Sequence, residues 1–170
     1  MEDSPLRLPR KGFSYLEVIM KKIYALNYLS NEFYNDYSAC DYPEIEHKVA
    51  RPYMVLLIKI ENNTYAIPFR TNIRHKYCYK FKHSNRESQS VTGLDYTKAV
   101  IVNDSKYIGG KANIDNKEFV ELNNKYYFII SQFKKYVMGY ADYTTGKLNQ
   151  YEQRKYRFST LKYFHKELGL

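Results

Sequence analysis

One stretch of this sequence combines the residue types that hold RNA with those that move protons. From Phe69 to Arg86 the chain has no acidic residue, and it interleaves six Lys or Arg and two His with Phe69, Tyr77, Tyr79 and Phe81. Cations attract phosphates, aromatic faces stack on unpaired bases, and Thr, Asn and His are groups that handle protons. The stretch therefore predicts a surface for single-stranded RNA and a candidate active site.

RNA cleavage without a metal defines the groups to look for. A base removes the 2′-hydroxyl proton, the oxygen attacks the neighbouring phosphorus, cations stabilise the charged intermediate, and an acid protonates the leaving 5′-oxygen. Arg70 and Arg74 are candidate phosphate clamps, because guanidinium matches phosphate oxygens bidentately. Thr71 and Asn72 are candidates to bind a non-bridging oxygen or to position the 2′-hydroxyl. His75 is the candidate acid or base, since histidine titrates near neutrality.

Each of these residue types also has a structural interpretation. The arginines can form a solvated basic loop, and Thr71 and Asn72 are common turn residues. His47 and His83 compete for the acid or base role. His83 and His165 are interpreted more simply as parts of a basic surface.

Residues from other segments are expected at the same rim. Arg51 precedes a buried strand and lies close to Arg70 if a hairpin forms, because outgoing and returning strands share a rim. Asp95 and Lys98, at the start of another strand, can join it; Asp95 is the only nearby carboxylate and can orient an Arg or a His, unless it is a plain turn residue. The side chains assigned to RNA binding are Lys76, Tyr77, Tyr79, Lys80, Lys82 and Lys98.

Composition limits the class of protein. The 170 residues carry a net charge of +9, which favours a polyanionic partner, either nucleic acid or an anionic membrane; the basic stretch favours nucleic acid. No HExxH, DxD, Cys/His cluster or P-loop is present, so no metal or cofactor is expected. The 20 Tyr are expected to be half-buried for the most part.

Compartment and domain organisation are also indicated by the sequence. Cys40 and Cys78 form no disulfide framework, which predicts a cytoplasmic protein. No apolar run approaches the length of a transmembrane helix. Residues 1–19 are interrupted by Pro5, Pro9 and Gly12, and they are expected to be a disordered leader or a non-native start. Residues 20–170 are expected to form a single domain.

The clearest element is a β-hairpin. Tyr53–Ile60 and Thr64–Phe69 are β-rich runs joined by the short turn Glu61-Asn62-Asn63. Pro68 cannot donate to a strand ladder, so we expect it at an edge or a strand end. The hairpin would deliver Arg70 and the residues after it to a sheet rim.

Periodicity predicts the remaining elements. They are strands over Ile23–Leu26, Tyr77–Phe81, Lys98–Asn103 and Lys106–Ile108 (ended by Gly109-Gly110); a helix over Asn27–Tyr37 capped by Asn27 or Ser30; a long helix opened by Asp115 with Glu118 at capping-box spacing; a final helix capped by Ser159 and ended by Gly169; and loops over 38–50, 84–92 and 144–152. Together they predict an α+β fold, with a mostly antiparallel sheet, helices packed on it and a basic rim.

The sequence resembles the RNase toxins of type III toxin–antitoxin systems, the ToxN, AbiQ and TenpN group. The motifs that carry the resemblance are Met20-Lys21-Lys22-Ile23-Tyr24, YMVLLIKI, PFRTNIRHKYCYKF and GLDYTKAVIVND. The TenpN branch looks closest, over about residues 20–168. The resemblance implies a strongly bent, Kid/MazF-like antiparallel sheet with added helices. It also implies a metal-independent endoribonuclease that leaves a 2′,3′-cyclic phosphate and a 5′-hydroxyl.

The resemblance further implies partners and a biological role. A small folded repeat RNA is expected to act as antitoxin in a closed toxin–RNA assembly, and cellular or phage mRNA is the expected substrate. The role would be phage defence by abortive infection and plasmid maintenance. The family's basic residue before the buried strand matches Arg51, and its hydroxyl after the returning strand matches Thr71. Arg74 stands about one position from the family's lysine, so Asn72 or His75 is expected to take over part of that lysine's role in proton transfer.

Two other functions are compatible with the same sequence. A non-catalytic RNA- or DNA-binding module would use the same basic, aromatic face, and its affinity would fall steeply with salt. A peripheral membrane protein is disfavoured, because the charge lies beside a hairpin and not on a long amphipathic helix.

Overall fold

The predicted hairpin forms the centre of a seven-stranded antiparallel sheet. In the computed structural model, which describes residues 24–47, 53–86 and 91–170, the strand order is β4-β5-β3-β2-β1-β7, and β6 also pairs with β3. The strands are β1 (Tyr24–Leu29), β2 (Met54–Ile60), β3 (Asn63–Arg70), β4 (Cys78–Lys80), β5 (Gly93–Asp95), β6 (Val100–Ile101) and β7 (Ile108–Lys111). A two-residue turn joins β2 to β3, with Ile60 opposite Asn63. The α+β class and the antiparallel sheet are confirmed.

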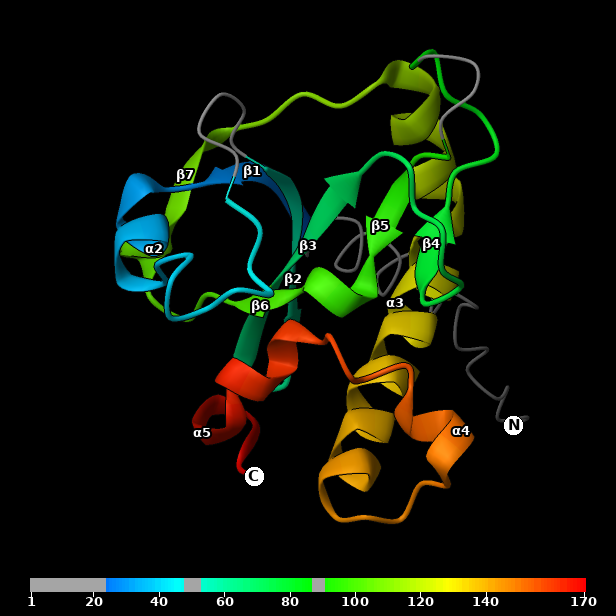
Figure 1. Cartoon of the computed structure of the whole chain (residues 1–170). Coiled ribbons are helices and arrows are strands. Elements are labelled where there is room, and N and C mark those ends of the chain that lie inside the picture. Colours follow the sequence, from blue (N-terminus) through cyan, green and yellow to red (C-terminus); the bar gives the residue numbers. More distant parts are fainter. Residues whose placement is uncertain (1–23, 48–52, 87–90) are drawn as a thin grey trace, which may run out of the picture.

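Helices cover this strongly bent sheet on different sides. They are α2 (Asn31–Asp36), α3 (Asn116–Thr144), α4 (Gln150–Gln153) and α5 (His165–Leu168), with 3₁₀ helices η1 (Tyr96–Lys98), η2 (Ser105–Tyr107) and η3 (Thr160–Tyr163). Figure 1 shows α3 running past β4 and β5, and α2 beside β1 and β7. Phe133 of α3 is fully buried, and its ring lies edge-on to Tyr65 of β3 at 5.3 Å. The predicted long helix is thus confirmed, and it packs on the sheet.

Pro68 is neither at an edge nor at the end of its strand. β3 pairs with β6 at Tyr65 and Ala66, and with β5 at Phe69 and Arg70. Pro68 lies between these two partners, at the point where the sheet needs no hydrogen bond from it. The strand therefore continues to Arg70, and only the next residues form the rim loop.

The helix expected over Asn27–Tyr37 begins only at Asn31, with Ser30, one of its two predicted caps, at its start. β1 runs on to Leu29, and the Asn27 amide donates to the Gly109 carbonyl of β7 at 2.9 Å. Ser30 caps the shorter helix α2, since its hydroxyl accepts the Phe33 N–H at 3.2 Å. Pairing with β2 and β7 outweighs the helical spacing of this segment.

Other boundaries also differ from the expected ones. Gly109 and Gly110 lie inside β7 and do not end a strand. Ile108 begins β7, while Lys106 and Tyr107 lie in η2. The strand expected over Lys98–Asn103 is reduced to the two residues of β6, because η1 occupies its start. Ser159 is a cap, as predicted, but of the 3₁₀ helix η3; Phe164 separates η3 from α5. Gly169 ends α5 in the left-handed region, at φ 68°.

Several predictions fall on residues outside the described ranges. These are the leader over 1–19, Arg51 and parts of the loops over 38–50 and 84–92. Within the described ranges, no helix has both the length and the apolar character that crossing a bilayer requires.

Gly93 of β5 should tolerate no side chain. A Cβ atom there would lie 2.1 Å from the Tyr79 carbonyl oxygen of β4 and 3.2 Å from Ile73 Cδ1, whereas one on Gly110 of β7 would meet nothing within 4 Å. We expect G93A to lose about 1–3 kcal/mol of unfolding free energy through overpacking. G110A is the matched control and should unfold close to the unaltered chain. Equal melting temperatures for the two variants would contradict this account of the β4–β5 contact.

Candidate functional site

A buried carboxylate joins three segments at the rim end of β3. The Asp95 side chain has no exposed surface, and its Oδ2 lies 2.5 Å from Arg70 Nη1 and 3.2 Å from His75 Nε2. Its Oδ1 accepts the Thr97 amide at 2.9 Å and the Thr97 hydroxyl at 2.7 Å. Asp95 therefore orients both an arginine and a histidine, as one of its two sequence interpretations predicted.

Asp95 remains ionised because its partners outweigh the cost of burial. Burial alone would raise its pKa, but hydrogen bonds from His75, Thr97 and Arg70 together lower the pKa to about 2. A fixed negative charge thus lies beneath the loop that follows β3.

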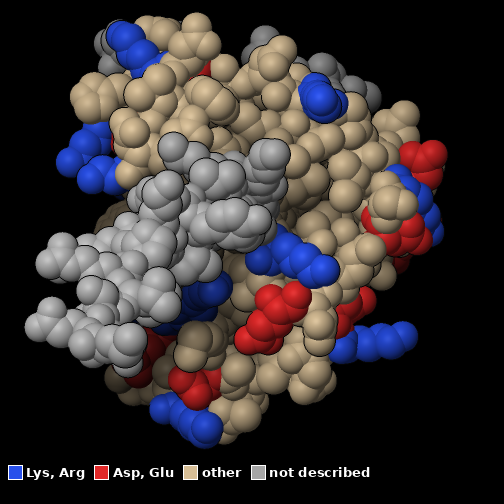
Figure 2. Space-filling model, turned by 180° about the vertical axis from the view of Figure 1, so that it is seen from behind, with Lys and Arg blue, Asp and Glu red and all other residues tan. Residues whose placement is uncertain are grey.

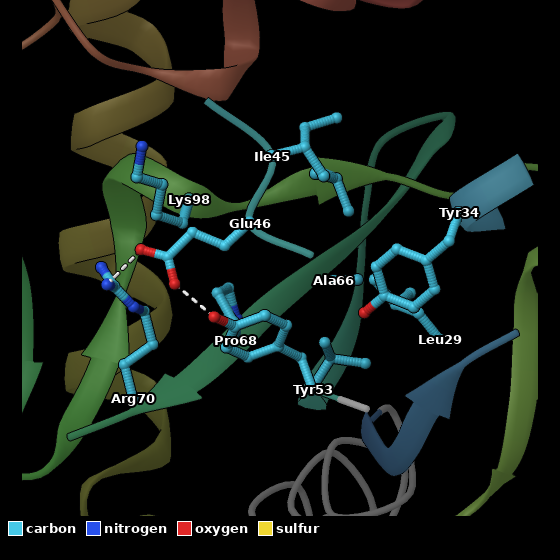
Figure 3. A pocket seen from close by; sticks show the side chains of 11 residues that line it. Leu29, Tyr34, Ile45, Glu46, Tyr53, Ala66, Pro68, Arg70 and Lys98 are labelled. Atoms are coloured by element: carbon cyan, nitrogen blue, oxygen red, sulfur yellow. Dashed lines mark hydrogen bonds and ion pairs between the residues drawn. The ribbon is translucent and has the colours of Figure 1, made fainter. Parts of the chain in front are cut away.

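A second carboxylate, Glu46, holds the other edge of the Arg70 guanidinium. Glu46 accepts a hydrogen bond from Arg70 Nη2 and another from the Tyr53 hydroxyl, as Figure 3 shows. The expectation that Asp95 is the only nearby carboxylate was wrong, because the loop before β2 returns to the end of β3. Burial lowers the pKa of Arg70, but the bond to Asp95 and the charge of Glu46 raise it overall.

Arg70 is consequently a compensated cation with spare donors. A guanidinium has five N–H groups, and the bonds to the two carboxylates use two of them. The side chain keeps 23% of its surface exposed. It can still donate to a phosphate, but its charge is already balanced by Glu46 and Asp95.

Both ring nitrogens of His75 are engaged. Nδ1 accepts the Tyr77 amide at 3.2 Å, and Nε2 faces Asp95 Oδ2. A ring nitrogen that accepts an N–H carries no proton, so this geometry assigns the hydrogen to Nε2 and leaves no free basic nitrogen. His75 here positions the loop, and it can take a proton only if one of these two bonds opens.

The residues just after β3 are exposed and unpaired within the described chain. Thr71, Asn72 and Arg74 are exposed, and their side chains form no hydrogen bond or ion pair with any other described residue. Asn72 has φ 59°, a left-handed conformation that asparagine tolerates. Ile73 between them is buried and its amide donates to the Val91 carbonyl at 3.3 Å, which fixes the loop.

Lys98 lines the same pocket as Arg70 and Glu46. The pocket lies between the loop before β2, β2, β3 and η1, and it is lined by Leu29, Tyr34, Ile45, Glu46, Tyr53, Val55, Ala66, Pro68, Arg70, Lys98 and Val100 (Figure 3). Lys98 Nζ donates to the Glu44 carbonyl at 3.0 Å and to the Phe158 carbonyl at 3.3 Å. Burial lowers the pKa of Lys98, and the charges of Glu46 and Asp95 oppose this only in part. A lysine of this kind is a candidate proton donor.

The residues assigned to RNA binding divide into exposed and buried groups. Lys76, Lys80 and Lys82 are exposed, and Tyr77 is half-buried with its ring stacked on His75 at 6.0 Å. Tyr79 is buried, and its hydroxyl donates to Glu121 at 2.7 Å. Burial removes Tyr79 from the rings that can stack on a base.

Two carboxylates of α3, Glu118 and Glu121, hold the basic segment after β4, a role that the sequence did not indicate for either. Glu121 accepts the amides of Lys82 and His83, each at 3.0 Å. Glu118 is fully buried and accepts Ser84 Oγ and Arg86 Nη2, both at 2.7 Å. Glu118 therefore does not close the capping box that its spacing suggests, although Asp115 caps α3 as predicted. Glu118 and Glu121 are three residues apart, on the helix face that carries the buried Leu122, and this spacing is the sequence feature that could have indicated their burial.

The other histidines lie away from Asp95. His47 Nε2 is 2.7 Å from the Tyr37 carbonyl oxygen, His83 faces Glu121, and His165 Nε2 is 2.8 Å from the Tyr140 hydroxyl. In the described segments, no group of three or more His, Cys, Asp or Glu is arranged to hold a metal ion.

Charge is mixed on one large face of the molecule. Figure 2, seen from behind, shows Lys and Arg scattered among Asp and Glu, with broad areas of other residues between them. The net charge of +9 is thus not gathered into one continuous patch on the visible part of that face.

Comparison with protein-family models, with curated proteins and with solved structures found no match for this chain. The functional argument therefore depends on the site itself.

Replacing Asp95 should destabilise the protein in a pH-dependent way. Its pKa is about 2 in the fold against 3.8 for an ordinary aspartate, so its ionised form stabilises the fold above pH 4, and this contribution is lost as the pH falls toward 2. We expect D95N to lose about 2 kcal/mol or more near pH 6, and the gap to the unaltered chain to narrow by about 2 kcal/mol on acidification. Urea unfolding at several pH values measures this.

D142N is the matched control, because Asp142 is half-exposed and makes only a 3.7 Å ion pair with Lys147. Its effect should be small at every pH. A D95N deficit that does not change between pH 6 and pH 2 would contradict the ionised state assigned to Asp95.

Proposed function

We propose that this protein is a metal-independent endoribonuclease that cuts single-stranded RNA at the end of β3. The observation that supports this most directly is the position of Asp95, which holds Arg70 and His75 in place immediately beside the exposed residues Thr71 and Arg74. The hydrogen-bonded cluster around Asp95 is rigid, and it presents the exposed Thr71 hydroxyl and the exposed Arg74 guanidinium. These two groups fit a phosphodiester in its transition state.

The reaction that fits these groups is transesterification by the 2′-hydroxyl. The 2′-oxygen forms a bond to phosphorus as its proton leaves, and the bond to the 5′-oxygen breaks as that oxygen gains a proton. The products are a 2′,3′-cyclic phosphate and a 5′-hydroxyl. Arg74 and the spare N–H groups of Arg70 would stabilise the negative charge on the phosphoryl oxygens, and the Thr71 hydroxyl would bind one of them.

Two groups of this cluster can carry a proton. Lys98 has a pKa lowered by burial, which makes its ammonium a better acid than an exposed lysine. His75 can act as a base once its ring releases the Tyr77 amide. We assign proton donation to Lys98 on the ground that both nitrogens of His75 are engaged.

The biological context follows the resemblance to type III toxins. In that context the protein is a cytoplasmic toxin whose substrate is cellular or phage mRNA, held inactive in a closed assembly by a folded repeat RNA, and it acts in phage defence. Arg51, which matches the family's basic residue, lies outside the described residues, and its part in the site stays a prediction of the resemblance.

A non-catalytic nucleic-acid-binding module is the alternative. Charge compensation favours it, since the Arg70 guanidinium is paired with both Glu46 and Asp95. The exposed Arg74, Lys76, Lys80 and Lys82 would be sufficient for binding without chemistry.

Thr71 and Arg74 separate the two functions. The unaltered protein should cleave an A-rich single-stranded RNA in excess EDTA, and end-group analysis should find the cyclic phosphate. T71A and R74Q should each lower kcat/KM about 100-fold or more, because each removes a group that stabilises the transition state. T71S should retain most activity.

K111Q, which removes an exposed charge on β7, is the control and should cleave normally. RNA binding without cleavage by the unaltered protein would establish the binding module. Normal cleavage by both T71A and R74Q would exclude this loop from the mechanism.

The pH dependence of cleavage should identify the proton donor. If Lys98 is the acid, the rate falls on the alkaline side at a pH below 10.5, because its pKa is lowered from that value. K98Q should be slow and lack this alkaline limb, and H75Q should keep it. An alkaline limb that persists in K98Q would refute the assignment.

A further inference from the structure

The chain after α3 presents two exposed aromatic rings with cations over them. Tyr151 and Phe158 leave 65% and 60% of their surfaces exposed. The Arg154 guanidinium lies 5.8 Å from the Tyr151 ring, and that of Arg157 lies 5.2 Å from the Phe158 ring. Lys76, from the loop after β3, places its Nζ 5.8 Å from the Tyr151 ring. We call these five residues the aromatic–cation strip.

The strip reaches the candidate active site at two points. Lys76 directly follows His75, so the Tyr151 end is adjacent to the loop that Asp95 holds. At the other end, Lys98 Nζ donates to the Phe158 carbonyl at 3.3 Å. The two rings are therefore linked to the two residues that we propose as proton carriers.

A buried tyrosine fixes the strip in place. Tyr156, between the two exposed rings, is 1% exposed, and its hydroxyl donates to the Tyr136 carbonyl at 2.7 Å. Gly139 of α3 makes room for that hydroxyl, since a Cβ there would lie 2.4 Å from it. The exposed rings are thus presented by an anchored segment, which lowers the entropy lost when a ligand binds.

The cations of the strip are not paired in the way that Arg70 is. In the described part of the chain, Lys76, Arg154 and Arg157 form no ion pair with a carboxylate. The nearest acidic residue in sequence is Glu152, and its carboxylate accepts a hydrogen bond from the Asn149 backbone N–H at 3.1 Å in a capping box. Three cations without an ion pair among the described residues, beside two exposed rings, match a chain that alternates phosphates and flat bases.

We propose that the aromatic–cation strip is the track that binds single-stranded RNA on both sides of the bond to be cut. Bases stack on Tyr151 and Phe158, and Lys76, Arg154 and Arg157 meet the phosphates between them. The position of the cut bond rests on the proposed function, but binding by the strip does not depend on cleavage. An apolar protein partner fits less well, since it would have to desolvate all three cations.

Binding of a non-cleavable RNA tests the strip independently of catalysis. The probe is a fluorescein-labelled, fully 2′-O-methylated single-stranded A-rich oligonucleotide, followed by anisotropy with the full chain. Y151A and F158A should each weaken binding about tenfold, because each removes one stacking platform. Y151F and F158Y should bind like the unaltered protein. Both rings are exposed, so unchanged melting temperatures should show that the variants fold.

The control is Y127A, which removes a tyrosine that is 48% exposed on α3 and has no described cation over its ring. Its affinity should not change. Normal binding by the Y151A/F158A double variant, or no binding by the unaltered protein, would overturn the inference. Cleavage of unmodified RNA is measured in parallel. Binding that depends on the strip, without cleavage, would support the strip and refute the proposed nuclease. Cleavage together with binding that does not depend on the strip would support the nuclease and refute the strip.

Discussion

The carboxylate of Asp95 is completely buried, and a buried charge is tolerated only when hydrogen bonds and opposite charges replace the lost water. Its four contacts meet this requirement and also fix the local chain path. Arg70 ends β3, His75 lies in the loop after it, and Thr97 lies in η1. Because each partner comes from a different segment, satisfying one carboxylate positions the whole rim at which a substrate would bind.

Buried carboxylates also hold the other end of the basic segment. Glu118 and Glu121 project from α3 and accept backbone and side-chain donors from residues 82–86. The segment without acidic residues is therefore held by carboxylates that are distant in sequence. Two of its arginines, Arg70 and Arg86, are used for this anchoring. The cations left for a polyanion are Arg74 and the exposed lysines.

The sequence predicted best those features that depend on local patterns. The β2–β3 hairpin follows from two apolar runs and a short polar turn, and Asp115 caps the long helix as its position suggested. The helix expected at Asn27 failed because long-range pairing with β2 and β7 decided that segment. Glu46 could not be assigned to Arg70 from the sequence, since the contact spans 24 residues and an irregular loop.

Charge compensation also explains why counting basic residues was a poor guide to the role of each one. Arg70, one of the predicted site residues, is balanced by Glu46 and Asp95. Arg154 and Arg157 follow the loop expected over 144–152 and had no predicted role, and they remain unpaired within the described chain. A paired guanidinium offers direction and a few spare donors, and an unpaired one offers attraction at longer range. Arg70 is thus assigned to orienting the substrate at the end of β3, and Arg154 and Arg157 to capturing RNA along the strip. Either function can therefore be altered by mutation without removing the other.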